Sequence, residues 1–414
     1  MPSDERRTSE IQLDTMGKHR WGERQVLHVA MVRSGPLQQQ HHLTTLCRFL
    51  VDSGFSLDFF SLQAPFEDEI WFGQQVPGMR VHWVGKWGGR GIGRFIRGGL
   101  ALRRALQETR FDILYVVDSW TLPYLFVATW GHMGFGGKPL VYHTFDLITP
   151  EGHGRAYVGL ERYAARRSRL NVNTDRSRAE VAKLMFGLKE RPLAVPLRLA
   201  RDAVLPGWDE GRREAILGSE RRGNEILAVY PTALRTDRLS KEVILAFAKL
   251  PPNYHLVTID AGGSYAMECH EVMRNNGLQH RIHLLPPMTH QAVLELCACA
   301  DIGLIFHDID AGIGNYFCHP GRLAYYVALG LPFVAAEVPA MSALVYRYGL
   351  GGCCSPYEPA AIAEAIRELC EGSIPLTDRR RHILEVFESK LHYGYEAQAL
   401  VSALERIRSG LTRA

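Results

Sequence analysis

The sequence has no hydrophobic run that approaches the roughly 20 consecutive apolar residues needed to cross a bilayer. Residues 1–24 are polar and charged, without the apolar stretch that a secretory signal requires. We therefore expect a flexible tail at residues 1–24 and a cytoplasmic protein, with peripheral contact to the inner face of a membrane as an alternative.

Paired cysteine motifs are also missing. The chain has eight cysteines, and none of them shows the CxxC spacing of a zinc site. Disulfides are not expected in a cytoplasmic chain, so we interpret the cysteines as mostly buried thiols. Asp308 and Asp310 form an Asp-x-Asp pair, but two carboxylates in a polar loop are more often solvated than metal-bound. No metal is expected.

Net charge is small, but its distribution is uneven. The whole chain carries a formal net charge of +4. Residues 1–205 hold 28 Lys and Arg against 20 Asp and Glu, a net of +8, and residues 206–414 hold 20 against 24, a net of −4. A basic first half is compatible with an anionic membrane surface, a phosphorylated acceptor or nucleic acid, and equally with a solvated surface.

The segment 83–110 concentrates this charge, because it interleaves tryptophan, phenylalanine and isoleucine with arginines. Such a pattern is typical of a surface that contacts lipid or an acceptor, or of an exposed helix face. Nucleic acid is not expected as a partner, since no RRM, KH or OB signature accompanies the segment.

Apolar runs of strand length alternate with helical patterns along the chain, which predicts parallel sheets covered on both faces. The candidate strands are residues 26–32, 56–62, 112–117, 139–143, 225–230, 255–260, 281–285, 302–306 and 333–336. A polar stretch with proline and glycine, residues 206–224, separates two series. We predict an α/β protein with two Rossmann-like domains, residues 25–205 and 206–385, and a C-terminal helical segment, residues 386–414.

Residues 301–345 are the most informative stretch. They predict a buried strand, a loop, a helix opened by Pro320-Gly321, a stop at Gly330 and a further strand. The N-terminus of a helix offers free N–H groups and a positive dipole end, which suit a diphosphate. Arg322, in that first turn, would add a charge-assisted contact.

This stretch resembles retaining GT-B glycosyltransferases of the family 4 type. The matching positions are Asn315, Pro320, Leu323, Tyr326, Gly330, Leu331 and Pro332, with Arg322 in the place of a lysine. The resemblance implies that Gly321 to Leu323 hold the diphosphate of a nucleotide-sugar donor. It also implies two Rossmann-like domains with a last helix that crosses back onto the first domain.

The resemblance extends over most of the chain and implies further site residues. Arg238 takes the place of the family lysine in the first loop of the second domain, and Arg235 is the nearest candidate for the arginine. Other donor or nucleotide contacts are expected at Gly35, Gly262, Gly263, Pro287, Met288, Asn315, Gly321, Leu323, Tyr325 and Tyr326. The catalytic set is expected to be His143, Asp146, Arg238 and Arg322.

The sequence departs from the family pattern at three positions. Tyr325 stands where the family has an acidic residue that bonds the donor ribose, and Phe317 occupies another position that is often acidic. Phe145 replaces the family histidine, while Asp146 is kept. His143 lies two residues before Phe145, so on a strand it would point to the same face and supply a shifted imidazole to the sugar.

These features predict a glycosyltransferase that uses a nucleoside-diphosphate sugar as co-substrate, without a cofactor, and an unidentified acceptor. The resemblance implies retention of anomeric configuration and a role in polysaccharide, glycolipid or natural-product synthesis. One alternative is a non-catalytic GT-B protein that binds a nucleotide sugar or a partner enzyme. A weaker alternative is a GT-B nucleotide-sugar epimerase.

Overall fold

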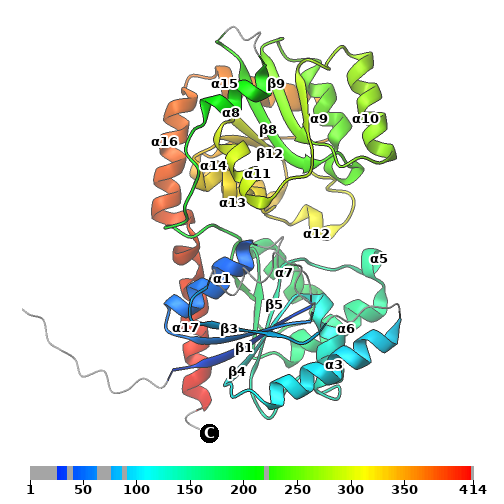
Figure 1. The fold of residues 1–414 in the computed structure, drawn as a ribbon, viewed down its shortest axis with the longest axis vertical. Helices are drawn as coiled ribbons and strands as arrows, with labels where there is room; N and C mark the ends of the chain where they lie inside the picture. Colours follow the sequence, from blue (N-terminus) through cyan, green and yellow to red (C-terminus); the bar gives the residue numbers. More distant parts are fainter. Residues whose placement is uncertain (1–25, 35–40, 63–75, 86–90, 219–222, 412–414) are drawn as a thin grey trace, which may run out of the picture.

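The computed structural model describes residues 26–34, 41–62, 76–85, 91–218 and 223–411. It contains two α/β domains, one above the other along the longest axis of the molecule (Figure 1). Each domain is built on one parallel sheet. Gly35, a predicted donor contact, lies outside the described residues.

The first domain contains a seven-stranded sheet in the order β3-β2-β1-β4-β5-β6-β7, with every pair parallel. The strands are β1 (His28–Arg33), β2 (Ser56–Ser61), β3 (Met79–Trp83), β4 (Ile113–Val117), β5 (Leu140–Thr144), β6 (Leu170–Asn173) and β7 (Leu193–Ala194). The central strands are apolar runs; all five residues of β4 and of β5 are buried. Burial on both faces is what a helix-covered parallel sheet requires.

Two helix layers cover this sheet. One layer holds α1 (His41–Asp52) and α17 (Tyr393–Leu411). The other holds α3 (Ile92–Gln107), α4 (Leu122–Ala128), α6 (Arg155–Arg167) and α7 (Arg176–Phe186). Helices α3 and α4 pack closely because Gly99 has no side chain: a Cβ there would lie 2.5 Å from Cβ of Val127.

The second domain contains a six-stranded sheet in the order β10-β9-β8-β11-β12-β13. The strands are β8 (Ile226–Ala233), β9 (Tyr254–Ile259), β10 (Ile282–Leu285), β11 (Ile302–Ile305), β12 (Phe333–Ala336) and β13 (Gly351–Cys354). One face packs against α9 (Ser240–Phe247), α10 (Ser264–Asn275) and α15 (Pro359–Glu371). The other packs against α11 (His290–Ala298), α13 (Arg322–Ala328) and α14 (Pro339–Tyr348).

The end of the chain joins the two domains. Helix α16 (Leu376–Val386) packs on the second domain, and a π-helical turn, Phe387–Leu391, leads into α17. Helix α17 then contributes Ala397, Leu400 and Leu404 to the core of the first domain. Its Glu396 forms an ion pair of 2.9 Å with the buried Arg198.

The predicted two-domain α/β architecture is confirmed. Four strands, β3, β6, β7 and β13, are not among the nine candidate strands. The polar stretch 206–224 contains helix α8 (Glu210–Leu217), which Asp209 caps by accepting from the N–H of Arg212. Within the described residues, none of the helices has the length and apolar character that a membrane span requires.

Candidate functional site

The loops that follow β5 and β11 meet where the two domains face each other. Gly314, in α12 (Ile313–Tyr316), lies so close to Leu147 that a Cβ would be 2.7 Å from the Leu147 carbonyl oxygen. Both loops leave the carboxyl ends of their strands, which is where parallel α/β sheets bind ligands. The predicted site residues are therefore best described by the sheet edge to which they belong.

Arg322 begins α13 at the carboxyl edge of the second sheet. Its guanidinium lies over the ring of Tyr230, 4.9 Å from the centroid, and its Nη2 donates to the Phe306 carbonyl at 3.2 Å. Its Nη1 is buried and has no hydrogen-bond partner within the described part of the chain. Since a buried unpaired guanidinium N–H is costly, this atom is suited to an anionic ligand.

His307 lies directly after β11, and its pKa is affected by the charged groups around it. Burial, together with the positive charges of Arg322, Arg238 and Arg178, lowers the pKa of His307 to about 4. The neutral ring donates from Nε2 to the Asn315 carbonyl at 2.9 Å. Arg322 and the loop of Arg238, both predicted from the sequence, are linked through Tyr230: its ring lies under the Arg322 guanidinium and its hydroxyl donates to the Arg238 carbonyl.

Arg235 and Arg238 flank Asp237 in the loop after β8. Arg235 donates from Nε to Asp237 Oδ1 at 2.8 Å and is largely exposed. Arg238 lies 3.9 Å from the same carboxylate through Nη2, a weaker contact. One carboxylate thus serves two guanidinium groups, and this loop keeps an excess of positive charge.

Gly262 and Gly263 follow β9 with positive φ angles of 76° and 101°. Only glycine adopts this conformation without strain. The N–H of Gly262 donates to Asp260 Oδ1 at 2.8 Å, and His270 contacts the other oxygen of Asp260. Apart from the chain neighbours of each glycine, no atom of the described residues lies within 4 Å of a Cβ built at Gly262 or Gly263, so the turn is open on that side. Pro287 and Met288 follow β10 in the next loop; Pro287 is exposed and Met288 packs against the core.

Three predicted donor contacts on α13 belong to the core. Leu323 and Tyr326 are fully buried. The Tyr326 hydroxyl contacts the carbonyls of Val229 and Leu304, each at 3.1 Å, so this side chain braces the sheet rather than facing a ligand. Tyr325 is also buried, and its hydroxyl bonds Nδ1 of His290 at 2.7 Å. The Leu323 N–H is engaged by the Pro320 carbonyl at 3.0 Å.

Asn315 connects α12 with the end of β11. Its side-chain Nδ2 donates to the Asp308 carbonyl at 3.0 Å, while its own carbonyl accepts from His307. Asp308 Oδ1 accepts from the Tyr357 hydroxyl at 2.7 Å and from the Asp310 N–H at 3.0 Å. Among the described residues, no three His, Cys, Asp or Glu side chains form a metal-binding group.

The carboxyl edge of the first sheet is neutralised internally. Arg33, at the end of β1, donates from Nε and Nη2 to Asp118 Oδ2 at 3.2 and 3.0 Å. Asp118 Oδ1 accepts from the Phe145 N–H at 3.1 Å. Burial raises the pKa of Asp118, against the lowering effect of Arg33. This buried pair fixes the turn that follows β5.

His143 and Asp146 occupy very different environments. His143 is 1% exposed, and its Nδ1 lies 2.8 Å from the Tyr115 hydroxyl. Burial lowers its pKa to about 3, so the imidazole is neutral. Its position beneath the surface, edge-on to Phe145, does not offer it directly to a sugar. The Asp146 side chain, in contrast, is 87% exposed.

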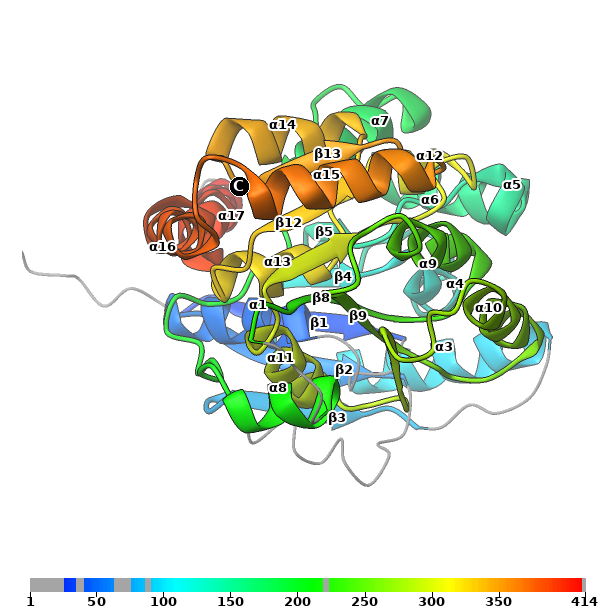
Figure 2. The same cartoon turned by 90° about the horizontal axis from the view of Figure 1, so that it is seen from above.

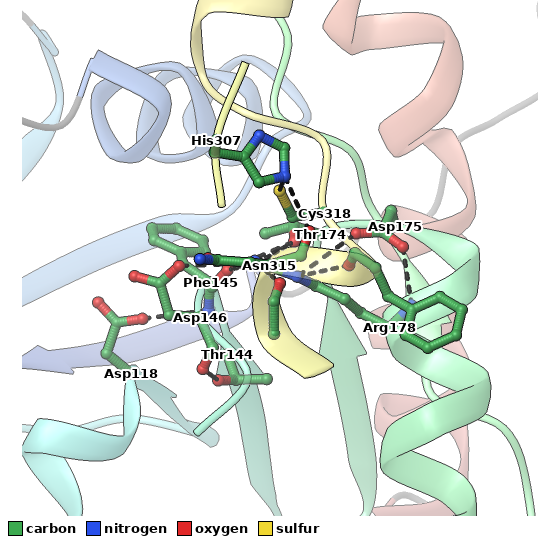
Figure 3. Close-up of polar contacts among 12 residues, drawn as sticks. Asp118, Thr144, Phe145, Asp146, Thr174, Asp175, Arg178, His307, Asn315 and Cys318 are labelled. Atoms are coloured by element: carbon green, nitrogen blue, oxygen red, sulfur yellow. Dashed lines mark hydrogen bonds and ion pairs between the residues drawn. The ribbon is translucent and has the colours of Figure 1, made fainter. Parts of the chain in front are cut away.

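Arg178 connects the domains (Figure 3). From the first turn of α7, its Nη2 donates to the Gly314 carbonyl and its Nε to the Phe317 carbonyl, both at 2.9 Å. Its Nη1 bonds the Phe145 carbonyl. One buried side chain therefore holds the turn after β5 and helix α12 together.

Sequence reasoning did not identify Arg178, nor the imidazoles of His42 and His290. Burial and the charges of Arg33 and His290 lower the pKa of His42 to about 3. Arg178 lay within a stretch that resembles the family, but its target carbonyls are more than 130 residues away. A local pattern carries no signal for such contacts.

Comparisons with known proteins agree with the architecture. Residues 39–195 match the model of Glycosyltransferase Family 4. A search of curated proteins gives no significant match.

Several solved structures share the fold. Anabaena Alr3699/HepE in complex with UDP and glucose is 15% identical, with a TM-score of 0.72 over 92% of this chain and 100% of that chain. Sucrose-phosphate synthase from Thermosynechococcus elongatus is 12% identical, with a TM-score of 0.66 over 94% and 99%. The lipopolysaccharide outer core galactosyltransferase WaaB is 14% identical, with a TM-score of 0.63 over 91% and 99%. This chain therefore has the GT-B fold, and its first domain matches the model of Glycosyltransferase Family 4.

Proposed function

We propose that the protein transfers a sugar from a nucleoside-diphosphate sugar to the hydroxyl of an acceptor, with the donor bound at the carboxyl edge of the second sheet. The observation that carries this proposal is the buried Nη1 of Arg322, which has no hydrogen-bond partner in the described residues. Tyr230 links Arg322 to the loop of Arg238, because its ring lies 4.9 Å from the Arg322 guanidinium and its hydroxyl donates to the Arg238 carbonyl. Two guanidinium groups at the sheet edge where the glycine turn after β9 also lies suit a diphosphate.

A uridine nucleotide is the first donor to test. The HepE structures of this fold hold UDP, UDP with glucose, or UDP-glucose. They support the choice of ligand, while the base and sugar used by this chain depend on its own pocket. Gly262 and Gly263 would allow the donor to approach the backbone closely after β9.

The chemistry required of the second domain is stabilisation of the leaving group. Negative charge accumulates on the diphosphate as the glycosidic bond breaks, and preorganised donors at that position lower the barrier. Arg322 and Arg238 would supply this positive charge, so we propose a metal-independent reaction. The acceptor proton would pass to the departing phosphate, with retention of configuration.

The first domain would hold the acceptor and the sugar hydroxyls. Asp146 is exposed at the end of the turn after β5 and can accept hydrogen bonds from hydroxyl groups. His143 would act indirectly, since it packs edge-on under Phe145. The acceptor itself is a hydroxyl compound that remains to be found by assay.

Calorimetry with UDP, GDP, ADP and dTDP on the wild type, Arg238→Ala and Arg322→Lys tests the donor site. We expect one nucleotide to bind, and Arg238→Ala to weaken it about tenfold to a hundredfold, since a hydrogen bond to a charged group contributes about 1.5–3 kcal/mol. Arg322→Lys keeps a charge but loses the planar fork, so it should also bind less tightly. Arg274→Ala, an exposed arginine of α10, is the control and should bind as the wild type does.

Two results would contradict the proposal. One is the same nucleotide affinity in the wild type and Arg238→Ala; the other is no binding of any of the four nucleotides. If a nucleotide does bind, a second assay measures the slow release of free sugar from the bound donor. This release distinguishes a transferase from the alternative, a protein that binds nucleotide sugar without turnover. A folded, nucleotide-binding wild type that never breaks the donor bond favours that alternative.

A further inference from the structure

Three of the four helices in the layer of α3, α4, α6 and α7 have an unusual charge composition. Helices α3, α4 and α6 carry eight arginines: Arg94, Arg97, Arg103, Arg104, Arg155, Arg162, Arg166 and Arg167. None of the eight is buried. The only acidic residue of the three helices, Glu161, is fully buried beneath them. The solvent side of these three helices, which we name the arginine face, therefore carries positive charge without compensation from its own helices.

The arginine face also exposes large apolar side chains. On α3, Ile92 and Ile96 are 75% and 46% exposed, one helical turn apart. Near the end of α4, Phe126 and Trp130 are 43% and 61% exposed. The guanidinium of Arg103 lies 5.2 Å from the centroid of Trp130, so the apolar and cationic groups are neighbours. Isolated surface apolar residues need no explanation, but a group among arginines does.

The three helices form one continuous surface. Helix α4 lies between α3 and α6, as the view from above shows (Figure 2). Arg103 of α3 donates to the Ala128 carbonyl of α4 at 2.9 Å, and Phe95 contacts Tyr124. Trp120 is exposed just after β4, and its ring centroid lies 5.1 Å from that of Tyr157 in α6. The patch thus extends to the carboxyl edge of the sheet.

The opposite layer of the same domain is a natural comparison. Helices α1 and α17 carry Arg48, Arg406 and Arg408 together with Asp52, Glu396 and Glu405. Positive and negative residues are equal in number there. The layer of α1 and α17 therefore carries no net charge from Lys, Arg, Asp and Glu, in contrast to the arginine face.

We infer that the arginine face binds an anionic lipid bilayer. Anionic headgroups attract arginines at about 1 kcal/mol each near the surface, and exposed isoleucine, phenylalanine and tryptophan side chains enter the interfacial region. A nucleic acid would also complement the charge of the arginines, but it would not explain the exposed isoleucines of α3, because a polyanion gains nothing from aliphatic side chains. The inference does not depend on the proposed sugar transfer.

Vesicle flotation tests the inference. The wild type is mixed with vesicles of phosphatidylcholine and phosphatidylglycerol in a roughly two-to-one ratio, or of phosphatidylcholine alone. We expect binding to the anionic vesicles only, weakened by salt. The double variant Arg97→Gln, Arg104→Gln removes two exposed arginines. Each loss should weaken partitioning about fivefold, so the double variant should partition about 25-fold less. Ile92→Ser with Ile96→Ser should weaken it at least about tenfold through the lost apolar contact.

Matched controls exist on other surfaces. Arg48→Gln with Arg406→Gln removes two exposed arginines from the α1 and α17 layer. Met267→Ser removes a 66% exposed apolar side chain from α10 of the second domain. Both controls should float as the wild type does. Circular dichroism and thermal unfolding of every variant verify that the fold is intact.

Three results would overturn the inference. The first is equal partitioning of the wild type and the Arg97→Gln, Arg104→Gln variant. The second is tighter binding of a single-stranded RNA than of anionic vesicles, lost in the same variant, which would assign the face to nucleic acid. The third is a dimer in analytical ultracentrifugation that Ile92→Ser with Ile96→Ser dissociates, without vesicle binding.

Discussion

The two domains share an architecture but treat the polar groups at their carboxyl edges in opposite ways. Both place a parallel sheet between helix layers, and both end their central strands where the domains meet. In the first domain, charges are buried and paired with each other. In the second, arginines outnumber the carboxylates near them.

The first-domain edge consists of groups that compensate one another. Arg33 and Asp118 form a buried ion pair, and the imidazoles of His42 and His143 are neutral, with pKa values lowered to about 3 by burial. Apart from the exposed carboxylate of Asp146, such an edge has little charge left for a ligand. It is suited to neutral hydroxyl compounds, which need hydrogen bonds rather than counterions.

The second-domain edge keeps its charge. Arg235 and Arg238 share the single carboxylate of Asp237, and Arg322 contacts a carbonyl and a tyrosine ring. This difference is consistent with the proposed function, in which an anionic donor would bind the second domain and a hydroxyl acceptor the first. Side chains at strand ends can differ in this way between two domains of one architecture, because function depends on sites grafted onto a fold.

Among the tests of this contrast between the domains, the largest change in the free energy of unfolding is expected when the buried ion pair of Arg33 and Asp118 is removed. Asp118→Asn keeps the shape of the side chain but leaves the Arg33 charge uncompensated. Removing one partner of a buried pair costs about 3–5 kcal/mol, so we expect the free energy of unfolding to fall by about 3 kcal/mol. Urea unfolding followed by circular dichroism measures it.

The matched control lies in the second domain. Asp237→Asn removes the partner of Arg235, an arginine whose side chain is largely exposed. Exposed ion pairs contribute roughly 0–1 kcal/mol, so this variant should unfold within about 1 kcal/mol of the wild type. Equal destabilisation by the two substitutions would show that the contrast between the edges is wrong.

A smaller effect is expected at the contact between the domains. Arg178→Ala removes the donors that bind the Gly314 and Phe317 carbonyls. Helix α12 would then lose its link to the turn after β5, and we expect faster amide exchange in residues 312–318 with a loss of about 2 kcal/mol of local stability. Hydrogen exchange with mass spectrometry measures it segment by segment.

Arg176→Ala is the control for this change. Arg176 lies two positions earlier in the first turn of α7 and is exposed. Its removal should leave the exchange of residues 312–318 as in the wild type. Unchanged exchange in Arg178→Ala would mean that other contacts hold α12, and that the arginine is not the link between the domains.

The fold was largely predictable from the sequence because its signals are local. Buried strands such as β4 and β12 are short apolar runs, and Gly330 ends α13 with a φ of 65° that favours glycine. Strand β13, Gly351–Cys354, was missed because two glycines and two cysteines carry little strand preference. It is an edge strand that pairs only with β12 among the described strands.

The site was predictable only in part. Arg322 lies in the first turn of α13, where the sequence pattern predicts an anion site, and Arg238 in the loop after β8, where the family resemblance implies a donor contact. The resemblance also implied that Tyr326 contacts the donor, but its side chain contacts carbonyl groups of β8 and β11. The role of Arg178 depends on which distant carbonyl groups lie near its helix. The sequence does not show this, because it follows from the packing of the two domains.

The smallest expected effect, measured between pH 6.5 and 8, concerns a buried carboxyl group of the first domain. Glu161 is fully buried and accepts from the Tyr142 hydroxyl at 2.8 Å. Burial raises its pKa from 4.5 to about 8, against the lowering effect of Tyr142. The folded protein therefore holds a proton that the unfolded chain releases, and stability falls as the pH rises from 4.5 to about 8, by up to roughly 1.4 kcal/mol per pH unit.

The interval from pH 6.5 to 8 isolates this group from the buried imidazoles. His42 and His143 are neutral in the folded protein at these pH values, and their unfolded pKa is 6.5, so their contribution changes mainly below that pH. Glu161→Gln keeps a hydrogen-bond acceptor for Tyr142 and cannot ionise. Its free energy of unfolding, measured in urea at intervals of pH, should lose the downward slope that the wild type shows. If both proteins show the same slope, the carboxyl group is already ionised in the fold, and the first domain carries a buried charge that its neighbours must stabilise.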